Sequence, residues 1–157
     1  MKTKNNKIAK RMYNKFYDGL IVTLGYCQIA SYTKEDKIFP GWMYQESEYK
    51  EEIENNAPEE LVIAPGEKFK LVINYPLRFP YKVGIDGGKN GLTRRKVLEF
   101  VIKCYKQIYK KEDEFRMSSN KNTTDGKYGI WGHNISDLVL HSLIFKKNRI
   151  LEVGVDS

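Results

Sequence analysis

Polar and apolar side chains alternate in two short stretches that lie close together in the chain. Every second residue is apolar in residues 69–77, and the same alternation returns in residues 81–85. Successive side chains of a β-strand point to opposite faces, so a period of two predicts two strands with one buried face each. Pro76 and Pro80 bracket the connection, which predicts a β-hairpin with prolines at strand ends or on an edge.

A different period begins after Thr93. Residues 94–115 contain no glycine or proline, and their apolar side chains fill one arc of about 160° on a helical wheel. Thr93 is a suitable N-cap, so the segment predicts one long amphipathic helix. Its buried face is expected to hold Val97, Leu98, Val101, Ile102, Cys104, Tyr105, Ile108 and Tyr109. Its water-facing side is expected to hold Arg95, Lys96, Glu99, Lys103, Lys106, Lys110 and Lys111.

Shorter patterns predict the remaining elements. Residues 20–32 indicate a strand bent at Gly25, and residues 138–145 and 150–156 indicate a second hairpin. His141 shares a strand face with Val139, Leu143 and Phe145, so it is expected to be a packed histidine with its hydrogen bonds satisfied. Residues 34–66 are polar and rich in turn residues, which predicts a long connection with one short helical piece near residues 47–55.

The last hundred residues are thus ordered as hairpin, helix and hairpin. The simplest packing is an antiparallel sheet with the long helix across one face, which belongs to the α+β class. A length of 157 residues suits a single domain covering residues 1–157, with residues 67–157 as its best-defined part. Residues 1–17 are either a basic arm or a short helix.

Composition adds a large and uneven charge. The chain is 41% hydrophobic, which is enough for a core, and its net charge is +7. Residues 1–17 carry +6, residues 18–66 carry −7 and residues 67–117 carry +7. Such asymmetry is compatible with a nucleic acid, an acidic partner or an anionic surface. Codon bias is an alternative source, because Lys outnumbers Arg by 21 to 6 and Asn, Ile and Tyr are also plentiful.

Cysteine usage and hydropathy argue against several classes of protein. Cys27 and Cys104 fit no metal-binding spacing, so we expect reduced thiols, no metal site, no cofactor and an intracellular location. The apolar run at residues 20–30 is too short to span a bilayer, and no cleavage site follows it. We therefore expect neither secretion nor a membrane partner.

Two basic regions are candidate binding sites. The first is the exposed helix face, where Arg95, Lys96, Lys103, Lys106, Lys110 and Lys111 could follow a phosphate backbone. Its alternative is a solvated face with ion pairs such as Glu99–Lys103. The second is the glycine loop at residues 86–95, where Lys89, Arg94 and Arg95 flank a helix N-terminus. This loop fits neither phosphate-binding motif, and its alternative is a tight strand-to-helix turn.

The stretch KYGIWGHN, residues 127–134, is a candidate catalytic loop. A short turn over residues 134–137 could bring His133 and Asp137 together as an oriented general base. The alternative is a structural corner in which Trp131 fills the core and His133 bonds nearby backbone. No nucleophile or metal partner is indicated by the spacing.

The segment TTDGKYGIWGHNISDLVLHSLIF, preceded by GLTRRKVLEFVIKCYKQIY, resembles an uncharacterised family of large DNA viruses and some protists. Its members share the block T-x-G-K-Y-G-I-W-G-H followed by DLVL. The resemblance covers roughly residues 69–157, and no established activity comes with it. It implies a small basic protein of a virion or a virus factory, in the host cytoplasm, the nucleus or the virion.

We favour a non-enzymatic binding or assembly protein whose basic helix face binds nucleic acid or an acidic protein. Two alternatives stay open. One is a small hydrolase that uses His133 and Asp137 near the glycine loop. The other is a virion structural protein that associates with itself as a homo-oligomer, for which tyrosine-rich surfaces are suitable.

Overall fold

The computed structural model describes residues 17–30, 59–119 and 125–157. Their secondary structure, in chain order, is β1 (Ile21–Gln28), β2 (Leu61–Ile63), β3 (Lys68–Ile73), β4 (Tyr81–Asp86), β5 (Leu92–Thr93), α3 (Arg94–Ser119), η3 (Ile135–Asp137), β6 (Val139–Lys146), η4 (Lys147–Arg149) and β7 (Ile150–Asp156). Within these residues, no helix is both long and apolar enough to cross a bilayer.

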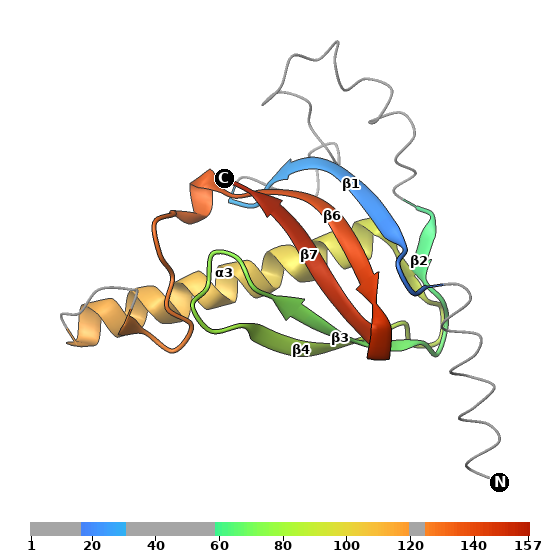
Figure 1. Ribbon diagram of the computed structural model, residues 1–157, viewed down its shortest axis with the longest axis horizontal. Helices are drawn as coiled ribbons and strands as arrows, with labels where there is room; N and C mark the ends of the chain where they lie inside the picture. The colour runs from blue at the N-terminus through green and yellow to red at the C-terminus, as the bar shows by residue number, and fades with distance from the viewer. Residues whose placement is uncertain (1–16, 31–58, 120–124) are drawn as a thin grey trace, which may run out of the picture.

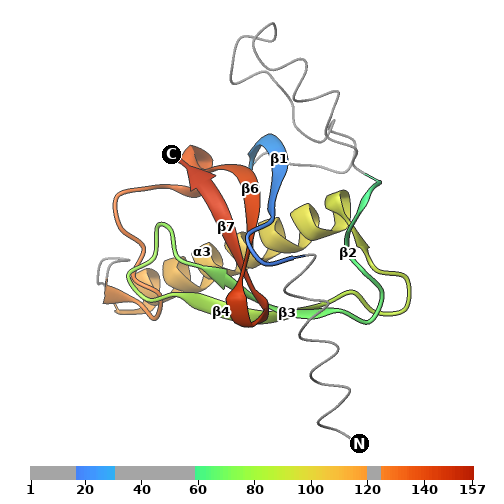
Figure 2. The same ribbon diagram turned by 45° about the vertical axis from the view of Figure 1, so that its right-hand side comes forward.

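The protein is built from two layers. Five strands form one sheet in the order β1-β6-β7-β3-β4, and α3 crosses behind that sheet in Figure 1. Figure 2, turned by 45°, shows β1, β6 and β7 as one layer in front of the helix. The short strands β2 and β5 pair with each other beside the start of α3. The predicted α+β class is confirmed.

The sheet differs from the expected one in the direction of one strand pair and in the number of its strands. It is mixed rather than wholly antiparallel, because β3 and β7 pair in parallel with Leu71 opposite Leu151. The chain between β4 and the second hairpin includes the long helix α3, and a connection of that length lets a strand return in either direction. The strand predicted at residues 20–32 joins the sheet as β1, and its register shifts between Thr23 and Cys27, around the predicted bend at Gly25.

The predicted hairpin and helix are both confirmed. In β3, Phe69, Leu71 and Ile73 are buried, and β3 pairs antiparallel with β4. The Lys96 backbone N–H donates to Thr93 Oγ1 at 3.3 Å, which is the expected N-cap. All eight residues expected on the buried face of the helix are buried. Sheet and helix side chains together form one core cluster.

The strand period placed His141 on one face with Leu143 and Phe145, and this grouping was wrong. The register of β6 against β7 shifts between Leu140 and Ser142, which is a β-bulge at His141. Beyond the bulge the two faces exchange, so Leu140 joins Leu143 in the core cluster. The His141 ring is left half-buried, with Nε2 3.6 Å from Asp156 Oδ1.

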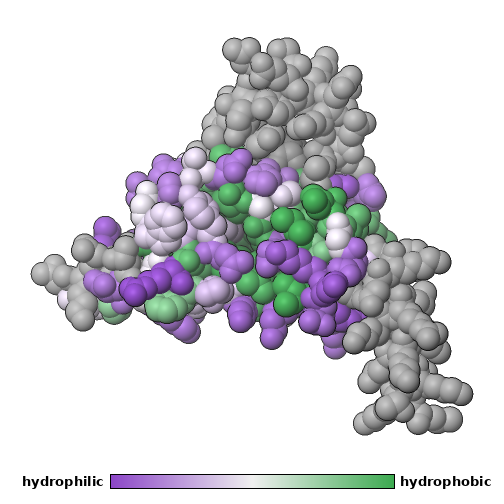
Figure 3. All heavy atoms as spheres, viewed as in Figure 1, coloured by the Kyte–Doolittle hydropathy of each residue, from purple (hydrophilic) through white to green (hydrophobic). Residues whose placement is uncertain are grey.

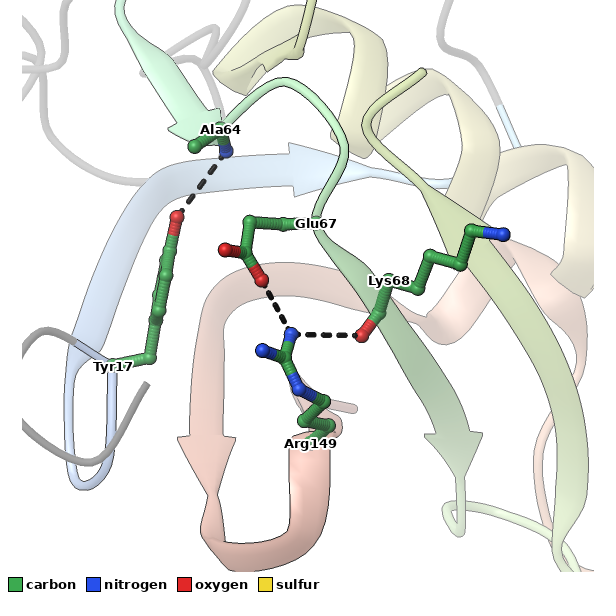
Figure 4. A network of polar contacts seen from close by, with 5 residues as sticks. All are labelled: Tyr17, Ala64, Glu67, Lys68 and Arg149. Atoms are coloured by element: carbon green, nitrogen blue, oxygen red, sulfur yellow. Dashed lines mark hydrogen bonds and ion pairs between the residues drawn. The ribbon is translucent and has the colours of Figure 1, made fainter. Parts of the chain in front are cut away.

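Arg149 ties the second hairpin to the start of β3 (Figure 4). Its guanidinium donates to the Glu67 carboxylate and, at 3.4 Å, to the Lys68 carbonyl. The same group lies 5.7 Å from the centre of the Phe69 ring. Nearby, the Tyr17 hydroxyl accepts the Ala64 N–H at 3.2 Å. The Arg149 contacts hold the start of β7 beside β3, where the parallel pair begins.

Two predictions on the first third of the chain fall mostly outside the described residues. They are the basic arm or helix at residues 1–17, of which only Tyr17 is described, and the helical piece near residues 47–55. The predicted connection at residues 34–66 was wrong at its end, because residues 61–63 form β2. This strand is too short to show a period, and its partner β5 lies about thirty residues further along the chain.

Candidate functional site

The exposed side of α3 carries a row of lysines. Four of them, here called the lysine stripe, follow one another at intervals of seven, three and four residues: Lys96, Lys103, Lys106 and Lys110. These intervals keep their side chains on one side of the helix, over a length of about 21 Å. All four are exposed, as is the neighbouring Lys111.

The lysines of the stripe are not neutralised by ion pairs within the described residues. Other cations there are paired: Arg94 with Glu60 at 3.2 Å, Arg95 with Glu59 at 2.8 Å, and Arg116 with an aspartate on its own helix. The alternative pair Glu99–Lys103 is not formed in this part of the chain. Two of the eight expected binding residues, Arg94 and Arg95, are therefore used inside the fold.

The glycine loop between β4 and α3 is a tight turn. The Gly88 N–H donates to the Asp86 carboxylate at 2.7 Å, and the Gly87 N–H donates to the Glu67 carbonyl at 2.8 Å. Gly88 and Gly91 have positive φ angles of 60° and 75°. Two of the N–H groups that an anion could use, those of Gly87 and Gly88, are bonded within the protein, so the turn interpretation fits better. Lys89 is exposed at the tip of this loop.

His133 and Asp137 have separate partners. The Asp137 carboxylate accepts the Asn134 backbone N–H at 2.8 Å and so caps the 3-10 turn η3, which confirms the predicted turn. His133 Nε2 lies 2.7 Å from the Tyr75 hydroxyl. The Tyr75 hydroxyl also lies 2.6 Å from Ser157 Oγ. His133 and Asp137 therefore do not form the oriented histidine–aspartate pair that a general base would use.

Tyr75 is a residue of this cluster that the sequence did not identify. It lies in the β3–β4 connection, 58 positions before His133. Two tyrosines of α3 bind the backbone of this cluster. The Tyr105 hydroxyl donates to the Tyr75 carbonyl at 2.8 Å. The Tyr109 hydroxyl donates to the His133 carbonyl at 3.0 Å. Burial raises the pKa of both phenols well above the ordinary value, so they stay protonated donors. A pairing this distant leaves no periodic signal in the sequence.

The structural alternative expected Trp131 to fill the core, and this expectation was wrong. Its side chain is 51% exposed, and the core is filled by Tyr128 and Ile130 instead. The Trp131 ring lies 6.1 Å from the ring of Tyr75 and 6.1 Å from that of His133. The sharp turns around it are made at Gly129 and Gly132, which both have positive φ. The loop is thus a corner that presents an aromatic ring to solvent.

Glu112 anchors the start of this loop from inside the protein. It is 1% exposed, and its Oε1 accepts the Tyr128 N–H at 2.8 Å. Its Oε2 has no hydrogen-bond partner. A Cβ at Gly126 would lie 1.8 Å from Oε2, so only glycine fits against the carboxylate. A glutamate within the polar end of the helix gave no sequence sign of burial.

The sheet face turned away from α3 is partly apolar. One row of paired residues runs across it from β1 to β4, consisting of Ile21, Ile144, Glu152, Val72 and Lys82. Ile21 is 63% exposed, and Figure 3 shows hydrophobic residues gathered between hydrophilic ones on this side. Lys146 pairs with Glu152 at 2.8 Å there. Self-association through such a face stays a prediction.

Neither cysteine chemistry nor a metal cluster is evident in the described residues. Burial raises the pKa of the Cys104 thiol, although a hydrogen bond from Tyr81 opposes that shift. A protonated, buried thiol is a poor nucleophile. In the same part of the chain, no group of three or more His, Cys, Asp or Glu side chains could hold a metal ion.

Comparisons with known proteins were made for the whole chain. No family model matches it, and no significant match was found among curated proteins or solved structures. The resemblance of roughly residues 69–157 to the viral and protist family therefore stays a prediction.

Proposed function

We propose that this protein is a non-enzymatic nucleic-acid-binding module that docks on a phosphate backbone through the lysine stripe of α3. One observation carries the proposal. Lys96, Lys103, Lys106 and Lys110 are exposed along one side of a single rigid helix and have no ion-pair partner in the described residues.

The spacing of the stripe suits a phosphate backbone. Phosphates follow each other every 3.4 Å or so along one strand of a duplex, so a row of about 21 Å faces several of them. Lysine is a compact point charge on a long flexible stem, and it needs no fixed geometry to approach a phosphate. Binding of this kind positions the protein without reading sequence. Taken with the motif resemblance, we infer such a module in a large DNA virus.

The enzyme alternative is less well supported. His133 is bound to Tyr75, and Asp137 caps η3, so the two do not act as a unit. An acidic protein is the other partner that the sequence suggested. Its carboxylates would have to match the lysine intervals, whereas a nucleic acid presents regular charge at any register.

Charge reversal of the stripe tests the proposal. In the variant Lys103→Glu, Lys106→Glu and Lys110→Glu, we expect the affinity for a fluorescein-labelled oligothymidine and for a duplex to fall at least about 100-fold at low salt. Losing an attraction of about 1 kcal/mol per lysine already gives a change of this size. Fluorescence anisotropy measures it.

A matched control separates the stripe from net charge. The variant Lys70→Glu, Lys82→Glu and Lys147→Glu has the same charge change at exposed positions outside α3. We expect it to lose less than about tenfold, through long-range repulsion alone. The proposal fails if the wild-type protein binds neither probe at about 50 mM salt. It also fails if both triple variants lose the same affinity.

A further inference from the structure

Two loops far apart in sequence form one surface beside the end of the sheet. Residues 74–80 and 126–134, here called the paired loops, run side by side. The Arg78 N–H donates to the Gly129 carbonyl and the Phe79 N–H to the Tyr128 carbonyl, both at 2.9 Å. The Trp131 N–H donates to the Pro76 carbonyl at 3.2 Å. These three bonds fix the backbone at the exposed tryptophan and in the residues before it.

The rings on this surface are held in place before any ligand arrives. Tyr128, Ile130 and Leu77 are buried beneath the loops. The Trp131 ring rests against Tyr75 and His133, whose side chains are bonded to each other. An exposed ring that is already ordered loses little entropy on binding. Trp131 and Phe79 are both exposed on these loops, and aromatic side chains are enriched at binding interfaces.

The charged side chains of the paired loops are all positive. Neither loop contains Asp or Glu, and both contain an exposed cation, Arg78 and Lys127. The Arg78 guanidinium lies 5.5 Å from the centre of the Phe79 ring, which is 53% exposed. The Lys127 ammonium lies 5.4 Å from the Tyr128 ring centre. A cation beside an exposed aromatic ring, as at Arg78 and Phe79, suits a ligand that is both planar and anionic.

The paired loops are attached to the same part of α3 as the lysine stripe. The Tyr105 and Tyr109 hydroxyls hold one loop each, through the carbonyls of Tyr75 and His133. Lys106 and Lys110 directly follow these tyrosines in the helix. Adjacent helix residues point about 100° apart, so these two exposed lysines lie about that angle around α3 from the buried tyrosines.

We infer that the paired loops are a stacking platform for an unpaired base, with Trp131 as the ring on which it stacks. The inference rests on the proposed function and narrows its ligand to single-stranded nucleic acid. The base faces of a duplex are covered by their neighbours, whereas a single strand can present a free face to an aromatic side chain. The lysine stripe then holds the backbone and Trp131 holds a base.

Replacing Trp131 tests the platform. In Trp131→Ala, we expect the affinity for oligothymidine to fall about tenfold or more, as loss of one stacked base gives. The affinity for the duplex should change less than about twofold, because a duplex offers no base to stack. Trp131→Phe keeps a ring and should retain most of the binding. Met117→Ala is the matched control, since Met117 is also an exposed apolar residue but lies outside the paired loops, in the last turn of α3.

Tryptophan fluorescence gives a second readout. In a Trp42→Phe background Trp131 is the only tryptophan, and we expect oligothymidine to quench its emission as the base stacks. The inference is overturned if Trp131→Ala binds the single strand like the wild-type protein, or if it weakens single strand and duplex equally. In either case the proposed function survives, provided that the charge-reversed triple variant still loses both probes. If the wild-type protein binds neither probe, the proposed function itself is overturned.

Discussion

Glu112 and Gly126 set the position of the exposed loop at the level of single residues. The carboxylate of Glu112 is buried under the loop, and one of its oxygens accepts the Tyr128 N–H at 2.8 Å. Gly126 lies against the other oxygen with no room for a methyl group. A buried carboxylate tolerates displacement poorly because its hydrogen bond would be lost without replacement by water.

Gly126→Ala should therefore destabilise the protein. The added methyl group must push the Glu112 carboxylate away from Tyr128, which we expect to lower the free energy of unfolding by about 1–3 kcal/mol. Urea unfolding followed by circular dichroism measures this change. Shortening residue 112 as well, in the Glu112→Ala background, should make the same substitution cost less, because the clash disappears.

Gly84→Ala serves as the control for that substitution. Gly84 lies in β4, and a Cβ at this position meets nothing within 4 Å. Adding a methyl group there should leave stability within about 0.5 kcal/mol or raise it slightly, since alanine has less freedom in the unfolded chain. Equal losses in Gly126→Ala and Gly84→Ala would contradict the close packing of Glu112.

At the scale of elements, one side of α3 packs in the core and its opposite side carries the lysine stripe. Its apolar side forms the core with the sheet and holds the paired loops through Tyr105 and Tyr109. Its polar side presents the lysine stripe. Because one helix fixes both, the distance between stripe and loops cannot vary freely, which is what a binding surface made of two parts requires.

The two buried phenols make stability depend on pH. Their pKa values are raised in the folded protein, while the unfolded chain titrates near the ordinary tyrosine pKa of about 10. The unfolded state therefore releases protons first, so this contribution to stability is complete below pH about 10 and is lost as the pH rises beyond it.

The double variant Tyr105→Phe and Tyr109→Phe checks this dependence. At neutral pH we expect it to lose about 1 kcal/mol of stability for each hydrogen bond removed. Above pH about 10 its free energy of unfolding should fall less steeply than that of the wild-type protein. Urea titrations across this range measure both values, and parallel alkaline declines in the two proteins would count against buried, protonated phenols.

Local periodicity predicted the elements that have a regular pattern. The helix after Thr93, its buried face and the hairpin of β3 and β4 follow from residue spacing alone, and the structure confirms them. The β-bulge at His141 has no such sign, because the extra residue in β6 is visible only against its partner strand. The parallel pairing of β3 with β7 likewise depends on contacts across about eighty residues.

The candidate site was predictable to a similar extent. Exposure of Lys103, Lys106 and Lys110 follows from the helical wheel, and the structure confirms it. The ion pairs of Arg94 and Arg95 were not predictable, since their partners lie in the segment before β2. The glycine-rich loop has two large aromatic rings, Tyr128 and Trp131. The sequence alone could not decide which of them is buried in the core and which is exposed.

At the scale of the whole molecule, the two-layer fold explains why a helix face is available for binding. The sheet covers one side of α3, and in the described residues no second layer covers the other. The charge there is positive, and residues 67–117 as a whole carry +7. The proposed binding of a polyanion to this basic face would therefore depend strongly on salt.

The salt dependence of binding tests the central claim most directly. If the four lysines of the stripe contact phosphates of a single strand, the logarithm of the association constant should fall with the logarithm of salt concentration with a slope of about −3. In the neutral variant Lys103→Gln, Lys106→Gln and Lys110→Gln, the slope should become shallower by about 2, because three contacts no longer release counterions. An unchanged slope in that variant would contradict the claim that α3 binds the phosphate backbone.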